Sequence, residues 1–249
     1  MSEQPNSTTT NKTGPDAEYI KNLFGSISTT YDKANDVITL GMARQWRKQL
    51  VNWSDAREGQ WVLDCATGTG DLAIEFKKAV GETGHVIGTD FCKEMLDVAP
   101  QKAAKQNLKV DFELADVMAL DYPNDKFDIA SIAYGIRNVA DIDVAIFEMA
   151  RITKPGGKVM ILETGEVENP MLQKAIRFYF KNIVPRLGGW VSGKRSAYEY
   201  LQSSSGRFPS GEEFCDVLRG SGQFVKVEFT SLMGGASFIY KCTVKDSIK

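Results

Sequence analysis

The sequence predicts an α/β protein whose doubly wound sheet is mostly parallel and ends in an antiparallel hairpin. From Trp61 onward, short β-type runs alternate with longer amphipathic stretches, a pattern that places helices on both faces of a parallel sheet. The first β-type run ends in a glycine-containing turn that opens a helix. Near the end of the chain, two β-type runs are joined only by Leu232-Met233-Gly234-Gly235, and so short a link requires an antiparallel pair.

The spacing of apolar residues along the chain predicts the individual strands and helices. Compact or alternating apolar runs indicate strands at seven places, which are Gln60–Cys65, His85–Thr89, Lys109–Leu114, Phe127–Ala133, Lys158–Glu163, Phe224–Ser231 and Ala236–Val244. Apolar residues recur at helical spacing between the parallel strands, so we expect helices over Asp71–Val80, Lys93–Gln106 and Asp141–Ile152. Right-handed crossovers through these helices make the first five strands parallel.

The remaining segments lie outside this alternation. We expect residues 1–16, which are polar, to form a disordered tail, and residues 17–58 to form a helical cap with helices at Tyr19–Phe24 and Val37–Val51. Residues 59–249 form the main domain, with a substrate-cap insertion at about 165–213. One helical stripe of the insertion is apolar and predicts a wall for an apolar substrate; it comprises Leu172, Ile176, Tyr179, Ile183 and Leu187, widened by Met171, Ala175, Phe178 and Val184.

Composition excludes several classes of protein. A net charge of −2 gives no basic face for nucleic acid, so no nucleic-acid partner is expected. The four cysteines form no C-x-x-C pair, and with His85 as the one histidine we expect no metal site but free thiols in a reducing cytoplasm. No apolar run reaches the roughly 20 residues that span a bilayer, and the N-terminus lacks the apolar core of a secretory signal.

The glycine loop that follows the first strand is the strongest local signal. Gly68 and Gly70 allow a ligand to approach the backbone closely, and ligands of open α/β sheets bind beyond the carboxyl ends of the strands. Asp90 follows the second strand, where a carboxylate can accept both hydroxyls of a ribose. Gly68-x-Gly70-x-x-Ala73 also satisfies the dinucleotide pattern, so NAD stays open on this loop alone.

Two acidic residues favour S-adenosyl-L-methionine (SAM) over NAD. Asp64 places negative charge near the cationic amino-acid end of SAM, whereas it would repel the pyrophosphate of NAD. Asp116 follows the third strand, where an acid can accept the amino group of adenine. A Rossmann-like parallel sheet with this loop and a terminal hairpin is the outline of the class I SAM-dependent methyltransferase fold.

Several segments indicate a more specific class of methyltransferase. The most diagnostic is the Gly135-Ile136-Arg137-Asn138 sequence after the fourth strand. With the other matching segments the chain resembles the ubiquinone/menaquinone biosynthesis C-methyltransferase family (UbiE/MenG). The other segments are Phe24 to Asp32, Asn35-Asp36, Gly41 to Trp46, Asp64 to Asp71, Tyr134, Val139 and Lys154 to Gly157.

The resemblance implies contacts with the cofactor, residue by residue. Thr69 and Asp90 match SAM contacts of the family, and Asp116 with Val117 occupies the adenine side. Ala133 also falls at a cofactor position, but many relatives have a serine there, so a side-chain hydrogen bond is not implied. Ala43 stands where some relatives carry a histidine, whose role therefore does not transfer.

The implied reaction is C-methylation of a polyprenylated quinol ring, with demethylmenaquinol favoured and the ubiquinone-pathway benzoquinol as a further substrate. Ionising a ring hydroxyl makes the ring carbon nucleophilic, and transfer needs in-line approach without water. Arg137 is our candidate for stabilising the quinolate, Asn138 for orienting the same oxygen, and Tyr31 for supplying a hydroxyl from the cap. Because such a substrate stays in lipid, we expect the enzyme to contact the inner face of the membrane transiently. The sequence leaves open whether the enzyme forms a homodimer.

Two other functions remain compatible with the sequence. A methyltransferase for another apolar molecule, such as a sterol or lipid, would keep every cofactor residue. A non-catalytic or NAD-binding nucleotide module would keep only the loop. Thermal stabilisation by S-adenosylhomocysteine but not by NAD would separate the methyltransferases from the last class.

Overall fold

A computed structural model describes residues 14–165, 167, 173–174, 179, 200, 204, 206 and 208–246. The expected N-terminal tail therefore lies almost entirely outside the described residues. The apolar stripe of the insertion is also outside them, apart from Tyr179.

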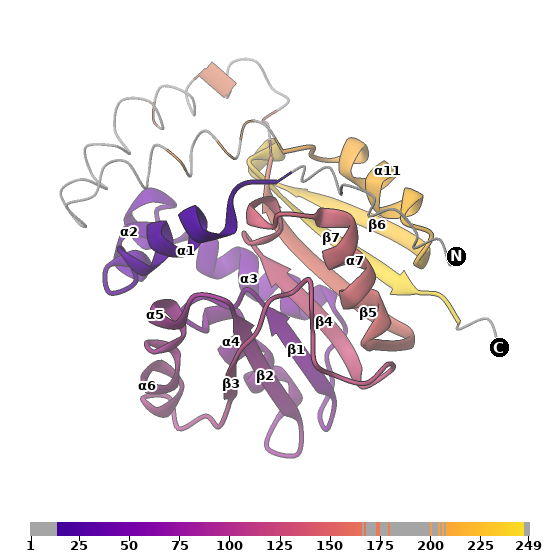
Figure 1. Ribbon diagram of the computed structural model, residues 1–249, viewed down its shortest axis with the longest axis horizontal. Coiled ribbons are helices and arrows are strands. Elements are labelled where there is room, and N and C mark those ends of the chain that lie inside the picture. The colour runs from indigo at the N-terminus through magenta and orange to yellow at the C-terminus, as the bar shows by residue number, and fades with distance from the viewer. Residues whose placement is uncertain are drawn as a thin grey trace, which may run out of the picture.

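A seven-stranded sheet forms the centre of the molecule, in the order β3-β2-β1-β4-β5-β7-β6 (Figure 1). Only β7 runs antiparallel to its two neighbours, β5 and β6, while the other paired strands are parallel. The strands are β1 (Trp61–Cys65), β2 (His85–Asp90), β3 (Asp111–Leu114), β4 (Phe127–Ala133), β5 (Thr153–Thr164), β6 (Phe224–Leu232) and β7 (Ser237–Val244). The predicted mixed sheet with its terminal hairpin is confirmed.

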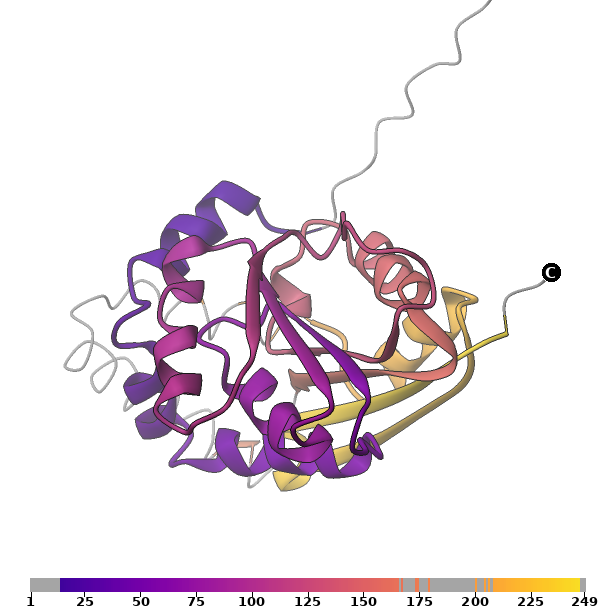
Figure 2. The same cartoon turned by 90° about the horizontal axis from the view of Figure 1, so that it is seen from below.

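Helices cover both faces of this sheet, as Figures 1 and 2 show. The helices α7 (Ile142–Arg151) and α11 (Glu212–Gly220) pack on one face, with Ile146, Met149 and Phe214 fully buried in its core. The helices α3 (Met42–Trp53) and α4 (Asp71–Val80) pack on the other, where Leu50 and Phe76 are fully buried. Two separate apolar layers therefore hold the sheet and fix the position of the strand ends.

The N-terminal helices pack beside the carboxyl ends of the strands (Figure 1). The helix α1 (Ala17–Gly25) begins at Asp16, whose side chain accepts a hydrogen bond of 2.8 Å from the backbone N–H of Tyr19. The helix α2 (Tyr31–Ile38) follows, and an apolar cluster that includes Leu23, Ile27 and Ala34 joins the two.

Two of the predicted helices are each interrupted. The expected helix Val37–Val51 is wrong, because α2 ends at Ile38 and α3 begins at Met42, with Leu40 and Gly41 at positive φ between them. The expected helix Lys93–Gln106 is also two helices, α5 (Lys93–Leu96) and α6 (Ala99–Ala104), with Pro100 in the first turn of the second. Proline lacks the N–H that a continuous helix would use, so it suits a new helix start.

Candidate functional site

A pocket opens at the carboxyl ends of β1, β2 and β4, on either side of the point where the strand order reverses. The described residues of its lining come from the glycine loop, the ends of β2 and β4, the loop after β3, residues 138–140, and helices α1, α2 and α5. Of the residues selected from the sequence, seven line it, namely Tyr31, Gly68, Asp90, Asp116, Val117, Ala133 and Asn138. Asp64, Thr69, Gly70 and Arg137 lie around it instead.

Asp90 is held rigidly at the pocket wall. One carboxylate oxygen accepts the backbone N–H of Cys92 and the other that of Gly68, both at 2.8 Å. Burial raises the pKa of Asp90 to about 6, although these two N–H groups favour the charged form. Each oxygen keeps a lone pair, so the carboxylate can still accept hydroxyl groups from a ribose.

The loop after β3 closes the opposite side of the pocket. Asp116 folds its carboxylate back onto the N–H of Met118 at 2.9 Å, while Val117 is buried below it. Both line the pocket together with Met118, so this side of the pocket combines an acid with apolar side chains.

The glycine loop takes a backbone shape that few residues allow. Gly68 and Gly70 have φ of 57° and 83°, and a Cβ on Gly70 would lie 2.9 Å from the side chains of Ala99 and Phe112. Ala66 and Tyr134, which both line the pocket, have positive φ without being glycine. Strained backbone of this kind persists where the surrounding structure holds it in place, and it clusters at ligand sites.

Asp64 supports this loop from below and is absent from the pocket lining. Its buried carboxylate accepts hydrogen bonds from the hydroxyls of Thr67 at 2.6 Å and Ser131 at 2.7 Å. Burial raises the pKa of Asp64 to about 7 against the effect of these donors. The side chain therefore ties the glycine loop to β4.

The charge of the pocket separates the two cofactors that the sequence left open. Among the described lining residues, Asp90 and Asp116 are acidic and none is lysine or arginine. SAM carries positive charge on its sulfonium and its amino group, which two carboxylates attract, whereas NAD brings two phosphates that they repel. The residues present therefore fit SAM.

The N-terminal helices cover the pocket from above. Ala17, Ile20 and Phe24 of α1 line it at spacings of three and four residues, which is one helical face. Tyr31 lines it from the start of α2 and packs edge-on against Phe24, with the ring centroids 6.0 Å apart. Burial raises the pKa of Tyr31, so its hydroxyl stays protonated and available as a donor.

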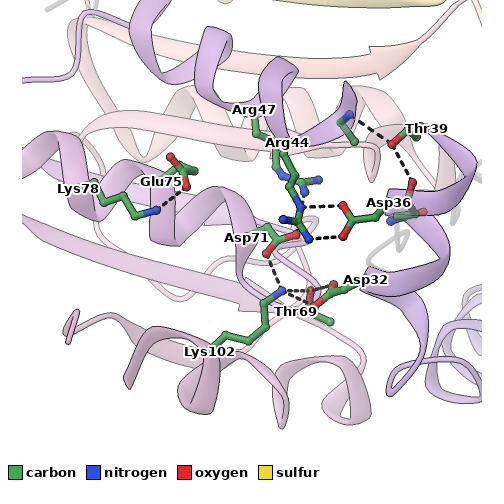
Figure 3. Close-up of polar contacts among 12 residues, drawn as sticks. Asp32, Asp36, Thr39, Arg44, Arg47, Thr69, Asp71, Glu75, Lys78 and Lys102 are labelled. Carbon is green, nitrogen blue, oxygen red and sulfur yellow. Dashed lines mark hydrogen bonds and ion pairs between the residues drawn. The ribbon is translucent and has the colours of Figure 1, made fainter. Parts of the chain in front are cut away.

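A polar network fastens this cap to the glycine loop (Figure 3). Asp32 of α2 accepts the hydroxyl of Thr69 at 2.6 Å and pairs with Lys102 of α6 at 2.5 Å. Lys102 also pairs with Asp71, the first residue of α4, at 2.5 Å. Arg47 of α3 reaches the other oxygen of Asp71 at 2.8 Å. The network therefore joins α2, α3 and α6 to the glycine loop and to the start of α4.

The cations decide the charge state of this network. Burial pushes the pKa of Asp71 upward, but the charges of Arg47 and Lys102 together outweigh that effect and the pKa is lowered. Thr69 uses its hydroxyl within the network, so we expect it to reach the cofactor through its backbone.

Removing Lys102 should loosen the closed cap. Lys102→Met deletes both partly buried ion pairs, and because each is worth at most about 1 kcal/mol, we expect affinity for S-adenosylhomocysteine to fall by about three- to tenfold. Calorimetric titration measures this, with Lys93→Met as the matched control because its pair with Asp97 is on the surface. Equal affinities in the two variants would show that the network does not hold the cap closed.

Arg137 and Asn138 belong to the short 3₁₀ helix η1 (Ile136–Asn138), which follows β4. The guanidinium of Arg137 is turned away from the pocket and forms a buried ion pair with Glu163 of β5. Its Nε lies 3.4 Å from the hydroxyl of Ser204. Asn138 remains in the pocket lining and accepts the hydroxyl of Tyr200 at 3.2 Å.

Sequence reasoning missed Glu163, Asp32 and Lys102. Asp32 stands in a segment that carries the resemblance, next to Tyr31, so that match is the signal that could have identified it. Glu163 was assigned only as the end of a strand, and nothing in a strand pattern indicates that its carboxylate faces Arg137. The α1 face could have been found from the spacing of Ala17, Ile20 and Phe24.

Comparisons with known proteins agree with this geometry. The profile of the ubiE/COQ5 methyltransferase family matches residues 12–244. A ubiquinone/menaquinone biosynthesis C-methyltransferase UbiE from Bdellovibrio bacteriovorus is 53% identical over 231 residues, covering 93% of this chain and 98% of that protein. A demethylmenaquinone methyltransferase from Deinococcus radiodurans is 38% identical, covering 82% and 84% of the two chains.

A solved structure agrees in fold. A SAM-dependent methyltransferase from Thermotoga maritima, described as a possible histamine N-methyltransferase, superposes with a TM-score of 0.64 at 19% identity, covering 90% of this chain and 99% of that one. At that identity the likeness concerns the fold alone, which is the class I SAM-dependent methyltransferase fold. The family profile, which spans nearly the whole chain, and the 53% identical relative show the family. This chain is a SAM-dependent methyltransferase that belongs to the ubiE/COQ5 methyltransferase family.

Proposed function

We propose that this enzyme methylates a ring carbon of a polyprenylated quinol, with demethylmenaquinol as the first candidate and the benzoquinol of ubiquinone synthesis as the second. The observation that carries the proposal is the family match over residues 12–244, together with relatives named for these quinones. The site supports it with a protonated Tyr31, a buried Arg137 and an acidic cofactor pocket between the cap and η1.

Bound SAM supplies a methyl group that is already electrophilic, so the protein has to prepare the acceptor. We assign Arg137 to the quinolate oxygen, because a guanidinium has five N–H donors and Glu163 and Ser204 use only two of its nitrogens in the described contacts. Asn138 is assigned to orient the same oxygen, and Tyr31 to donate a hydroxyl from the cap.

A transfer assay tests this function. The enzyme is mixed with SAM bearing a deuterated methyl group and with a short-tailed demethylnaphthoquinol, the corresponding benzoquinol, a sterol or an unsaturated fatty acid. Mass spectrometry with fragmentation then locates the label. We expect the label on a ring carbon of a quinol; label on the sterol or fatty acid alone would favour the other class of methyltransferase.

We further propose that the enzyme meets its substrate at the inner face of the membrane without crossing it. None of the described helices is long and apolar enough to span a bilayer. Leu40, at the turn between α2 and α3, is 76% exposed, and Val37 beside it is also exposed. The hydroxyl of Tyr179 binds the carbonyls of Val37 and Ile38, so this residue lies next to the exposed apolar side chains. Such side chains can enter the boundary between headgroups and acyl chains.

Liposomes should therefore raise the activity on a long-tailed quinol. Leu40→Ser should weaken this stimulation, because it removes the most exposed apolar side chain of the cap. Leu114→Ser is the matched control, since Leu114 is 62% exposed on the edge strand β3. Rates that do not change when lipid is added would argue against membrane contact through the cap. An equal loss of liposome stimulation in the two variants would argue against it as well.

A further inference from the structure

Glu163 is a buried acid paired with Arg137, and its two oxygens are unequal. It is the next-to-last residue of β5, opposite Phe238 of β7, and is fully buried. One oxygen, Oε1, receives every donor: the guanidinium of Arg137, the backbone N–H of Thr164 at 2.7 Å and the hydroxyl of Thr164 at 3.1 Å. Within the part of the chain that the structure describes, the other oxygen, Oε2, has no hydrogen-bond partner.

An oxygen without a donor is unusual at this depth. Buried polar atoms are nearly always hydrogen-bonded, because an unpaired one costs about 1–3 kcal/mol, and more if it is charged. Glu163 is instead fixed by three donors on one side and left with bare lone pairs on the other. A carboxylate in this arrangement is oriented and can still accept a proton.

The ion pair lies beside η1, which also contributes a residue to the pocket lining. Arg137 is in η1, whose Asn138 lines the pocket. Glu163 directly precedes the insertion, and two residues near its other end touch η1: Ser204 contacts Arg137, and Tyr200 contacts Asn138. Tyr200 and Ser204 therefore lie beside the η1 segment that holds Arg137. The hydroxyl of Ser204 lies 3.4 Å from Nε of the guanidinium, so a hydroxyl oxygen fits beside it.

We propose that Glu163 is the proton acceptor for the quinol hydroxyl, with Arg137 holding the same oxygen. This inference rests on the function proposed above. Arginine cannot be the acceptor, since a guanidinium stays protonated in proteins. Tyr134 and Tyr240 are the other titratable groups near Glu163 in the described part of the chain, and burial raises the pKa of each, so both remain neutral.

The chemical step balances without a further reactant. The hydroxyl proton moves to Oε2, and the electron pair left on the ring oxygen is delocalised onto the neighbouring ring carbon. That carbon forms a bond to the transferred methyl group, and the electrons of the broken carbon–sulfur bond stay on sulfur, giving S-adenosylhomocysteine. The methylated carbon then releases its hydrogen as a proton to water, and Glu163 returns the first proton to the ring oxygen. One proton is released for each methyl group transferred.

Glu163→Gln tests this assignment, because it keeps the shape of the side chain and removes the basic oxygen. We expect turnover to fall by about a hundredfold or more, which is the scale of general base catalysis, with little change in the KM for quinol or in the affinity for S-adenosylhomocysteine. Glu163→Asp should recover part of the rate. Glu148→Gln is the matched control, since Glu148 pairs with Arg151 on α7 and does not line the pocket.

Quinols of graded acidity separate proton transfer from a structural role. A more acidic quinol needs the acceptor less, so the ratio of wild-type to Glu163→Gln rates should shrink as substrate acidity or pH rises. A ratio that stays constant, or near-normal turnover of Glu163→Gln, would overturn the proposal. A wild-type enzyme that methylates no quinol in the same assay would instead overturn the proposed function. Retained thermal stabilisation by S-adenosylhomocysteine shows that each variant is folded.

Discussion

Replacing Arg137 with alanine is expected to lower turnover by about a hundredfold or more, the usual effect of losing one preorganised donor. The affinity for S-adenosylhomocysteine should change little, because the guanidinium is turned toward Glu163 and away from the described pocket lining. Steady-state rates at saturating quinol and SAM, combined with calorimetric titration, measure the two quantities separately.

Arg137→Ala should also destabilise the fold. Arg137 and Glu163 are both almost completely buried, and removing one partner of a buried ion pair costs about 3–5 kcal/mol because the remaining charge is left uncompensated. Arg137→Lys should restore the charge but only part of the rate, since the planar fork is lost. Near-normal turnover of Arg137→Ala at saturating quinol, or a defect confined to cofactor binding, would contradict our assignment and make the loop structural.

Replacing Asp90 with alanine is expected to weaken the binding of S-adenosylhomocysteine by at least tenfold. A hydrogen bond to a charged group contributes about 1.5–3 kcal/mol before desolvation is subtracted, and the carboxylate is placed to accept two hydroxyls. The change also removes the acceptor of the Gly68 N–H, so the glycine loop loses one of its supports. Unchanged affinity in Asp90→Ala would remove this residue from the cofactor site.

The pKa of Asp90 gives the same prediction a pH dependence. Because burial raises that pKa to about 6, the free protein carries an ionised Asp90 above this pH and a protonated one below it. A ribose hydroxyl donates to the charged form, so affinity for S-adenosylhomocysteine should fall as pH decreases through about 6. Asp90→Asn should lose this component of the pH profile, while any component due to Asp64 remains.

The fold was largely predictable because its strands are short, apolar and evenly separated by amphipathic helices. Asp71–Val80 and Phe127–Ala133 were predicted with the bounds that the structure gives them. Helix breaks were harder to predict: the pattern of apolar residues runs through Leu40 and Gly41, although their positive φ ends one helix before the next begins. Periodicity reports which residues face a core and does not detect a turn that keeps the same face buried.

The site was predictable where backbone position alone decides it. Asp90 ends β2, and topology brings the carboxyl ends of the parallel strands to one edge of the sheet. Side-chain partners follow no such rule, since Glu163 reaches Arg137 across 26 residues of sequence and Asp32 reaches Lys102 across 70. For the same reason the position of Arg137 in a loop after a strand made it a candidate for catalysis, whereas nothing in the sequence identified its ion-pair partner Glu163.

The most direct test of the proposed quinol methylation is the quinone content of cells with and without the gene. Quinones are extracted and compared by mass spectrometry, and the missing enzyme is then restored from a plasmid. We predict that loss of the gene replaces the mature menaquinone with a species lighter by one methylene group, and that the intact gene, but not the Glu163→Gln or Arg137→Ala form, reverses this. An unchanged quinone profile in cells that lack the gene and have no second copy would contradict the proposed function.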